Sequence, residues 1–228
     1  MRIGLISDVH GNLSALRAVM RKMRRTDMIL CAGDLTGFCV RPAKVISIVR
    51  RRKIRSVLGD CDSAVVSGSL DGLPEEIKEA CAWTGRKLGE KHADFLRSLP
   101  EKIEVKARGF RIMVVHGSPA DPLRGRITPE TSSERLAEMM ADVGADILVV
   151  GHTHRQLSRR FFGRILVNPG SVGQPRDRDP RACFAILRLD GEPEVELGRV
   201  EYPVDEEVAL IKREGLPASL VSRLLYGW

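Results

Sequence analysis

The chain has 228 residues, 43% of them hydrophobic and 29% charged, and 37 Lys and Arg against 30 Asp and Glu give a formal net charge of +7. This apolar fraction excludes global disorder, because it is sufficient for a substantial buried core. The apolar runs are only a few residues long, far short of the roughly 20 residues that span a bilayer, so we expect no membrane-spanning helix.

The composition does not divide the chain into regions. No linker rich in Pro, Gly or Ser interrupts it, so we expect one domain over residues 1–228. The N-terminus reaches Asp8 before a hydrophobic signal segment could form, which favours a cytoplasmic location. The five cysteines include no CxxC pair, so we expect neither a disulfide framework nor a zinc ribbon.

The first 60 residues alternate between short β-rich apolar runs and helical periodicity, which predicts a βαβαβ arrangement. We expect strands at 3–6, 28–31 and 54–58, and helices at 13–23 and 42–50. Such alternation indicates a parallel sheet covered by helices, with reactive residues where the strands end.

Residues 63–101 read as mostly helical and are expected to form a cap beside the edge of the sheet. Strands at 103–107 and 111–115 should form a hairpin whose second strand leads to His116. A helix is predicted at 132–143, opened by a capping box of Thr131 and Glu134.

In the last third of the chain, short strands replace the helices. A strand at 147–150 is followed by short strands with Gly-containing turns between them, which we expect to form an antiparallel meander. These strands are predicted at 156–161, 165–167, 182–189 and 194–200. Residues 205–228 return to helix, beginning with three acidic residues that suit a helix N-terminus.

Five polar segments that carry Asp and His each follow a predicted strand at once. They are Asp8-x-His10, Gly33-Asp34, Gly59-Asp60-x-Asp62, His116-Gly117 and Gly151-His152-x-His154. Each pattern alone is more typical of a turn or a buried histidine, but together they bring four of the five histidines to one sheet edge. The fifth, His92, is expected to be structural.

Carboxylate and imidazole ligands suit Mn, Fe, Zn, Ni or Co, and seven candidate ligands exceed what one tetrahedral zinc needs. We therefore expect two divalent metal ions. A pair of ions of this kind clamps phosphate oxygens and activates a water near neutral pH, so the pattern predicts phosphoryl chemistry by metal-bound hydroxide.

The five segments, in this order, resemble those of the calcineurin-like metallophosphoesterase superfamily, and the resemblance runs from Met1 to about Leu189. Residues 168–176 are also similar to a segment of small prokaryotic single-domain members, many of them phosphodiesterases. The resemblance implies an α/β fold in which two mixed sheets pack face to face with helices on both outer faces, a four-layer α-β-β-α sandwich.

The resemblance also implies a role for each candidate ligand. One metal ion would be held by Asp8, His10 and His154, the other by Asp60, His116 and His152, with Asp34 bridging them.

The chain departs from the family pattern twice. Cys61 stands where many members carry a histidine that acts as general acid, and a thiol is a poorer acid for an alkoxide. Phosphodiesters or substrates with good leaving groups are therefore favoured, although Cys61 could equally only pack beneath the site. Asp60 replaces the family's asparagine. The added negative charge lowers the net charge of the site by one, so the site should hold the second metal more tightly and attract an anionic substrate less.

Four further residues are candidates for contact with the substrate or the ligands. Asp62 could orient the ligands or act with Cys61, and Asn12 could donate to a phosphate oxygen. Arg176 and Arg178 could each make a bidentate contact with a phosphate, although an isolated arginine is more often only exposed.

The sequence thus predicts a dinuclear phosphoesterase that acts on phosphodiesters or nucleotides. A nuclease is less favoured, because aromatic residues make up only 4% of the chain and offer no stacking platform. A metal-binding scaffold protein with weak or lost turnover is favoured by Asp60 alone. Whether the chain forms a homo-oligomer is left open.

Overall fold

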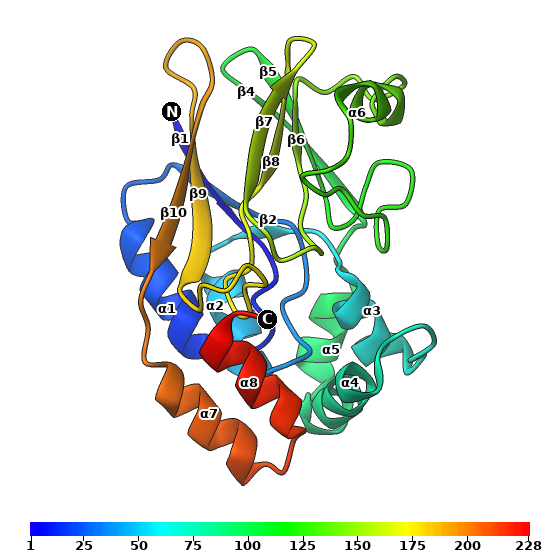
Figure 1. Ribbon diagram of the computed structural model, residues 1–228, viewed down its shortest axis with the longest axis vertical. Helices are drawn as coiled ribbons and strands as arrows, with labels where there is room; N and C mark the ends of the chain where they lie inside the picture. Colours follow the sequence, from blue (N-terminus) through cyan, green and yellow to red (C-terminus); the bar gives the residue numbers. More distant parts are fainter.

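The computed structural model describes residues 1–228 and consists of two five-stranded sheets that face each other, with helices outside them (Figure 1). The first sheet has the order β10 (Glu194–Val200), β9 (Ala182–Arg188), β1 (Arg2–Ile6), β2 (Met28–Cys31) and β3 (Arg55–Ser56). The second has the order β4 (Lys102–Ala107), β5 (Phe110–Val115), β6 (Ile147–Val149), β8 (Arg164–Asn168) and β7 (Leu157–Phe161).

Both sheets are mixed. In the first, β1, β2 and β3 are parallel, whereas β9 is antiparallel to both β1 and β10. In the second, β5, β6 and β8 are parallel, and β4 and β7 are antiparallel to their neighbours.

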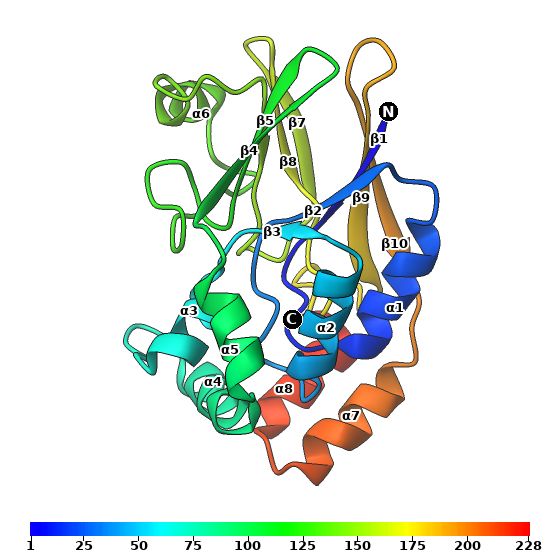
Figure 2. The same ribbon diagram turned by 180° about the vertical axis from the view of Figure 1, so that it is seen from behind.

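Strand β1 shows how the layers arise from the two-residue period of a strand. Ile3 and Leu5 belong to a core of 17 buried residues between the sheets, and Ile6 belongs to a core of 24 on the opposite face. Helices α1 (Leu13–Lys22) and α2 (Pro42–Arg51) cover that face (Figure 2). Helix α6 (Ser133–Met139) packs on the outer face of the second sheet. The expected four-layer α-β-β-α sandwich is confirmed.

The remaining helices form a separate group below the sheets in Figure 1. They are α3 (Asp60–Ser67), α4 (Glu75–Lys87), α5 (Glu90–Arg97), α7 (Val204–Arg213) and α8 (Ala218–Tyr226). The expected helical segment 63–101 corresponds to α3, α4 and α5. A shared cluster of buried apolar residues joins α3 and α4 to α7 and α8. The C-terminal helices are therefore packed against the predicted cap.

The predicted meander is wrong. Strands β7 and β8 form a hairpin in the second sheet, whereas β9 and β10 form a hairpin in the first. Residues 169–181 carry the chain from one sheet to the other. An apolar run predicts a strand in the same way whichever sheet that strand joins, so the sequence pattern did not distinguish the two arrangements.

The predicted capping box of Thr131 and Glu134 is also wrong, by one residue. Ser132 is the N-cap of α6, because its hydroxyl accepts a hydrogen bond from the Arg135 N–H at 3.1 Å. The Thr131 hydroxyl instead accepts from the Thr128 N–H at 3.0 Å. None of the helices combines the length and apolar composition that crossing a membrane requires.

A buried carboxylate attaches α7 to the rest of the fold. Glu207 is fully buried, accepts a hydrogen bond from the Ser14 N–H at 3.0 Å and forms an ion pair with Arg41. We predict that Glu207→Ala lowers the free energy of unfolding by about 3 kcal/mol, because Arg41 and the Ser14 N–H lose their partner in a buried setting. Chemical denaturation measures this change.

The matched control is Asp205→Ala, at an exposed position in the first turn of the same helix. It should change the unfolding free energy by less than about 0.5 kcal/mol. If both variants destabilise equally, Glu207 does not anchor the helix.

Candidate metal centre

The predicted ligands lie in loops whose backbone is held in an uncommon conformation. Five of them have φ between 50° and 65°, in the left-handed region: Asp8, His10, Asp34, His152 and His154. Such a conformation costs a non-glycine residue on the order of 1 kcal/mol or more, and it concentrates at functional sites. The surrounding packing must therefore hold these loops in place.

Two glycines of the motifs allow these loops to approach each other. A Cβ atom on Gly59 would lie 2.0 Å from Oδ1 of Asp34, and one on Gly151 would lie 2.0 Å from Oγ of Ser7. Neither position has room for a side chain. The Gly-Asp and Gly-His pairs in the sequence are therefore packing requirements of the converging strand ends.

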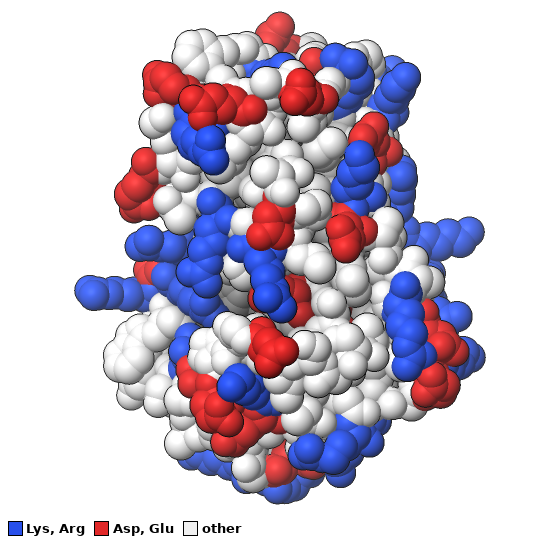
Figure 3. Space-filling model, turned by 90° about the vertical axis from the view of Figure 1, so that its right-hand side faces the viewer, with Lys and Arg blue, Asp and Glu red and all other residues white.

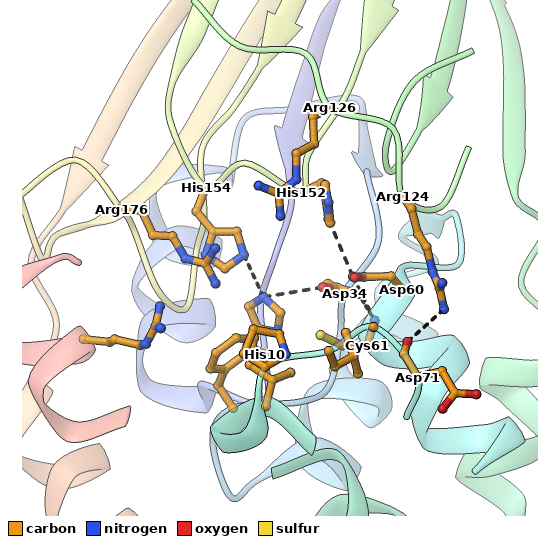
Figure 4. Close-up of a pocket in the computed structure, with 16 residues that line it drawn as sticks. His10, Asp34, Asp60, Cys61, Asp71, Arg124, Arg126, His152, His154 and Arg176 are labelled. Carbon is orange, nitrogen blue, oxygen red and sulfur yellow. Dashed lines mark hydrogen bonds and ion pairs between the residues drawn. The ribbon is translucent and has the colours of Figure 1, made fainter. Parts of the chain in front are cut away.

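The first group of ligands combines residues from both sheets. Nε2 of His10 lies 3.0 Å from Nε2 of His154 (Figure 4). Nε2 of His154 in turn lies 3.3 Å from Oδ1 of Asp8. Asp8 and His10 follow β1, and His154 follows β6. These three atoms are close enough together to hold one ion.

The second group is built in the same way. Oδ1 of Asp60, the first residue of α3, lies 3.2 Å from Nε2 of His116 and 3.7 Å from Nδ1 of His152. Asp34 lies between the two groups, because its Oδ2 is 3.6 Å from Nε2 of His10 and 3.6 Å from Nε2 of His116. The structure thus brings all seven predicted ligands together.

Backbone carbonyls orient three of the four imidazole rings. Nδ1 of His10 donates to the Thr36 carbonyl at 2.9 Å, and Nδ1 of His116 donates to the Ala32 carbonyl at 2.7 Å. Nδ1 of His154 donates to the Gln174 carbonyl at 2.6 Å. A carbonyl can only accept, so each Nδ1 carries a proton and each Nε2 is turned into the site.

This donor set fits metal ions. Two Nε2 lone pairs, from His10 and His154, face each other at 3.0 Å, and a cation between them would relieve the repulsion. Oδ1 of Asp8 is buried without a hydrogen-bond partner, and a buried carboxylate oxygen is normally paired or bound to a metal. Both features are accounted for by an ion in the first group.

Burial controls the protonation of the same residues. It lowers the pKa of His10 well below its ordinary value, with the nearby charge of His154 adding to the effect. It raises the pKa of Asp34 well above its usual range. Neutral imidazole is the form that binds a metal, and an ion would supply the charge that stabilises the Asp34 carboxylate.

Asp62 acts on the ligands indirectly. Its carboxylate is fully buried and accepts hydrogen bonds from the Leu35 N–H at 3.0 Å and from the Thr36 N–H and hydroxyl at 2.9 and 2.8 Å. It thereby fixes the loop whose Thr36 carbonyl orients His10. It does not line the cavity at the site, so the structure offers no contact between Asp62 and a substrate.

Asn12 and Arg178 lie away from the cavity. The Asn12 side chain accepts from the Ala15 N–H and donates to the Gly173 carbonyl and the Tyr202 hydroxyl, all at 3.0 to 3.1 Å. Asn12 is therefore a helix cap and not the expected phosphate contact. Arg178 is exposed and outside the cavity, so its expected contact with substrate is likewise not supported.

A cavity of about 200 Å³ opens onto the metal ligands. Four arginines line it, of which Arg176 was expected and three were not: Arg124, Arg126 and Arg223. In Figure 4, Arg176 lies beside His154, and Arg126 extends toward His152. Lys and Arg side chains also gather near the middle of the face shown in Figure 3.

Cys61 lies at the base of the cavity. Its backbone N–H donates to Oδ1 of Asp34 at 3.0 Å, and its side chain is buried. A hydrogen bond with Cys81, together with burial, raises the pKa of the Cys61 thiol well above its ordinary value. The thiol therefore stays protonated and is a weak proton donor.

Comparison with known proteins identifies the family. Residues 1–192 match the model of the calcineurin-like phosphoesterase superfamily domain. A probable metallophosphoesterase of Methanothermobacter thermautotrophicus is 27% identical, with 90% of this chain and 95% of the relative covered. A protein of Methanocaldococcus jannaschii is 31% identical over 99% of this chain and 98% of its own length.

Among solved structures, a metallophosphoesterase from Sphaerobacter thermophilus is similar over 100% of this chain and 99% of its own, with a TM-score of 0.87 and 36% identity. A protein from Pyrococcus horikoshii shares the fold with a TM-score of 0.91 over 100% and 98% of the two chains, at 24% identity. The chain belongs to the calcineurin-like phosphoesterase superfamily.

Proposed function

We propose that this protein is a dinuclear metal-dependent phosphoesterase that hydrolyses phosphodiesters or nucleotide-like substrates. The position of Asp34 supports this most directly. Its Oδ2 lies at the same distance, 3.6 Å, from one histidine of each three-residue group. A carboxylate in that position can be shared by two ions.

The first ion would be held by Asp8, His10 and His154, and the second by Asp60, His116 and His152, with Asp34 shared. The mixed oxygen and nitrogen donors suit Mn, Fe, Ni, Zn or Co. When bound, two such ions neutralise the charge that develops on the phosphoryl oxygens and make a water more acidic.

The chain itself would bind and orient the ester. Arg126 has no ion-pair partner and extends toward His152 (Figure 4), so its guanidinium is free to donate to a phosphoryl oxygen. Arg124 lines the same cavity and donates weakly to the Asp71 carbonyl at 3.5 Å. Together they would neutralise the anionic substrate beside the second group of ligands.

Cys61 favours diesters over monoesters. In the family pattern this position carries a histidine that could protonate the leaving oxygen, whereas the Cys61 thiol is buried and holds its proton tightly. Cys61 would give little general-acid assistance to a leaving group that departs as a simple alkoxide. Substrates with stable leaving groups should therefore react best.

A binding or scaffold protein with lost turnover is the second candidate, and Asp60 is the observation that favours it. Its carboxylate lies within 3.2 Å of His116, where the family pattern has a neutral asparagine. An added negative charge at this place would oppose the approach of an anionic substrate.

The first prediction from the proposed function concerns the metal content of the protein. The protein should bind two divalent ions per chain, and removing them should lower the melting temperature, because the ions bind only the folded ligand set. Elemental analysis after loading with excess Mn gives the stoichiometry.

Asp34→Asn should reduce the stoichiometry, because it weakens the shared ligand. The control is His92→Ala, since His92 is far from the site and faces Ser47 of α2. A wild-type value that stays at one ion or fewer under metal excess would rule out the dinuclear site.

The second prediction concerns the leaving group. The wild type should hydrolyse bis(p-nitrophenyl) phosphate better than p-nitrophenyl phosphate, and Cys61→His should gain activity toward the monoester by about tenfold, since general-acid catalysis contributes at least that much. Cys61→Ala is the control, because it removes the thiol without adding an acid. Preference of the wild type for the monoester would refute the role assigned to Cys61.

The third prediction separates the enzyme from the scaffold. Asp60→Asn keeps the side-chain size but removes one negative charge, so affinity for the second ion should fall. Turnover at saturating metal should rise, and a barrier lower by about 1.4 kcal/mol would appear as a tenfold faster rate. Titration calorimetry and initial rates on the same preparation measure both quantities.

Asp71→Asn is the matched control, because Asp71 lines the same cavity but belongs to neither ligand group. It should leave metal affinity unchanged. If Asp60→Asn also leaves it unchanged, Asp60 is not a ligand.

A further inference from the structure

Two of the arginines that line the cavity come from segments that carry no candidate metal ligand. Arg176 comes from the crossover segment after β8, and Arg223 comes from α8. Helix α8 lies outside residues 1–192, the part of the chain that matches the family model. Arg223 therefore comes from a part of the chain that the family model does not cover.

The fold holds Arg223 in place. Its Nη2 donates to Oε1 of Glu76 on α4 at 2.6 Å, and both side chains are about three-quarters buried. Apolar packing of Leu220 and Leu224 against α4 and α7 fixes the helix on either side of it. The guanidinium thus reaches the cavity from a rigid element.

Arg176 has no anionic partner. It forms no ion pair, and its Nε is buried without a hydrogen bond. Its guanidinium lies over the ring of Phe38, 5.9 Å from the centroid, and beside His154 (Figure 4). A buried cation without a partner is unfavourable, so an anion bound here would be stabilised.

The dimensions of the cavity restrict what that anion can be. At about 200 Å³ the cavity is smaller than the roughly 300 Å³ or more of a site that encloses a whole drug-sized ligand. Two adjacent phosphate groups would occupy a space of this size and meet the arginines that line it. The nucleoside or other organic part would then remain near the opening.

We propose that Arg176 and Arg223 form a subsite for a second phosphate, adjacent to the one at the metal ligands. The preferred substrate is then an ester of a diphosphate, such as a nucleoside diphosphate derivative. This inference rests on the proposed function, because it assumes that the first phosphate lies at the metal centre.

Equilibrium binding tests the subsite without requiring turnover. We would titrate ADP and AMP, at fixed free Mn, into wild type, Arg223→Gln and Arg176→Gln. ADP should bind the wild type about tenfold more tightly than AMP, and this ratio should fall toward one in both variants, since each charged hydrogen bond is worth roughly that factor. Chelation of Mn by ADP is the same for every protein and cancels in the comparison.

Two controls separate charge recognition from loss of structure. Glu76→Gln breaks the same ion pair as Arg223→Gln but leaves the cation in the cavity, so it should keep the preference for ADP. Arg178→Gln removes an exposed arginine from the same segment as Arg176 and should also keep it. If Glu76→Gln loses the preference as fully as Arg223→Gln, the ion pair and not the cation is responsible, and the subsite is rejected.

Hydrolysis of bis(p-nitrophenyl) phosphate by the same wild-type preparation tests the proposed function separately. If the protein hydrolyses this diester but binds ADP and AMP equally well, the subsite is refuted and the proposed phosphoesterase activity is supported. If the protein does not hydrolyse this diester but prefers ADP in a way that depends on Arg223, the subsite is supported and the proposed phosphoesterase activity is refuted.

Discussion

Three hydrogen bonds from imidazole rings to backbone carbonyls determine what the candidate metal centre can do. The Thr36, Ala32 and Gln174 carbonyls each accept a hydrogen bond from a histidine Nδ1. These bonds keep a proton on Nδ1 and turn Nε2 of each ring into the site. The orientation of these rings therefore does not depend on a bound cation. Movement of one of these carbonyls would turn a ring and remove a ligand.

The carbonyls in turn depend on the loops that carry them. Asp62 anchors Thr36 through both its N–H and its hydroxyl, and Gly59 allows the neighbouring loop to approach Asp34. Asp62, which does not line the cavity, therefore controls the orientation of His10, a candidate metal ligand. The left-handed backbone of Asp8 and His10 is tolerated because this packing holds it.

Much of this could be predicted from the sequence, since strand ends followed by Asp or His are visible in the pattern itself. The first two strands and the two helices have clear periodicity, and their expected bounds differ by at most one residue from those observed, whereas the third strand, expected at 54–58, is only Arg55–Ser56. That β8 joins the second sheet and β9 the first could not be predicted, because the apolar pattern of a strand does not specify its partner. Arg124, Arg126 and Arg223 were missed because an arginine at a cavity wall belongs to no motif and is recognised only once distant segments are brought together.

Each ligand group draws residues from both sheets. Asp8 and His10 follow a strand of the first sheet while His154 follows one of the second, and Asp60 follows β3 of the first sheet while His116 follows β5 of the second. An ion in either group would be a cross-link across the seam of the sandwich, at the end where the apolar core gives way to polar loops. Amide protons of β1 and β6 near this seam would then exchange more slowly as ions are added, so metal loading would make the two halves of the molecule open as one unit.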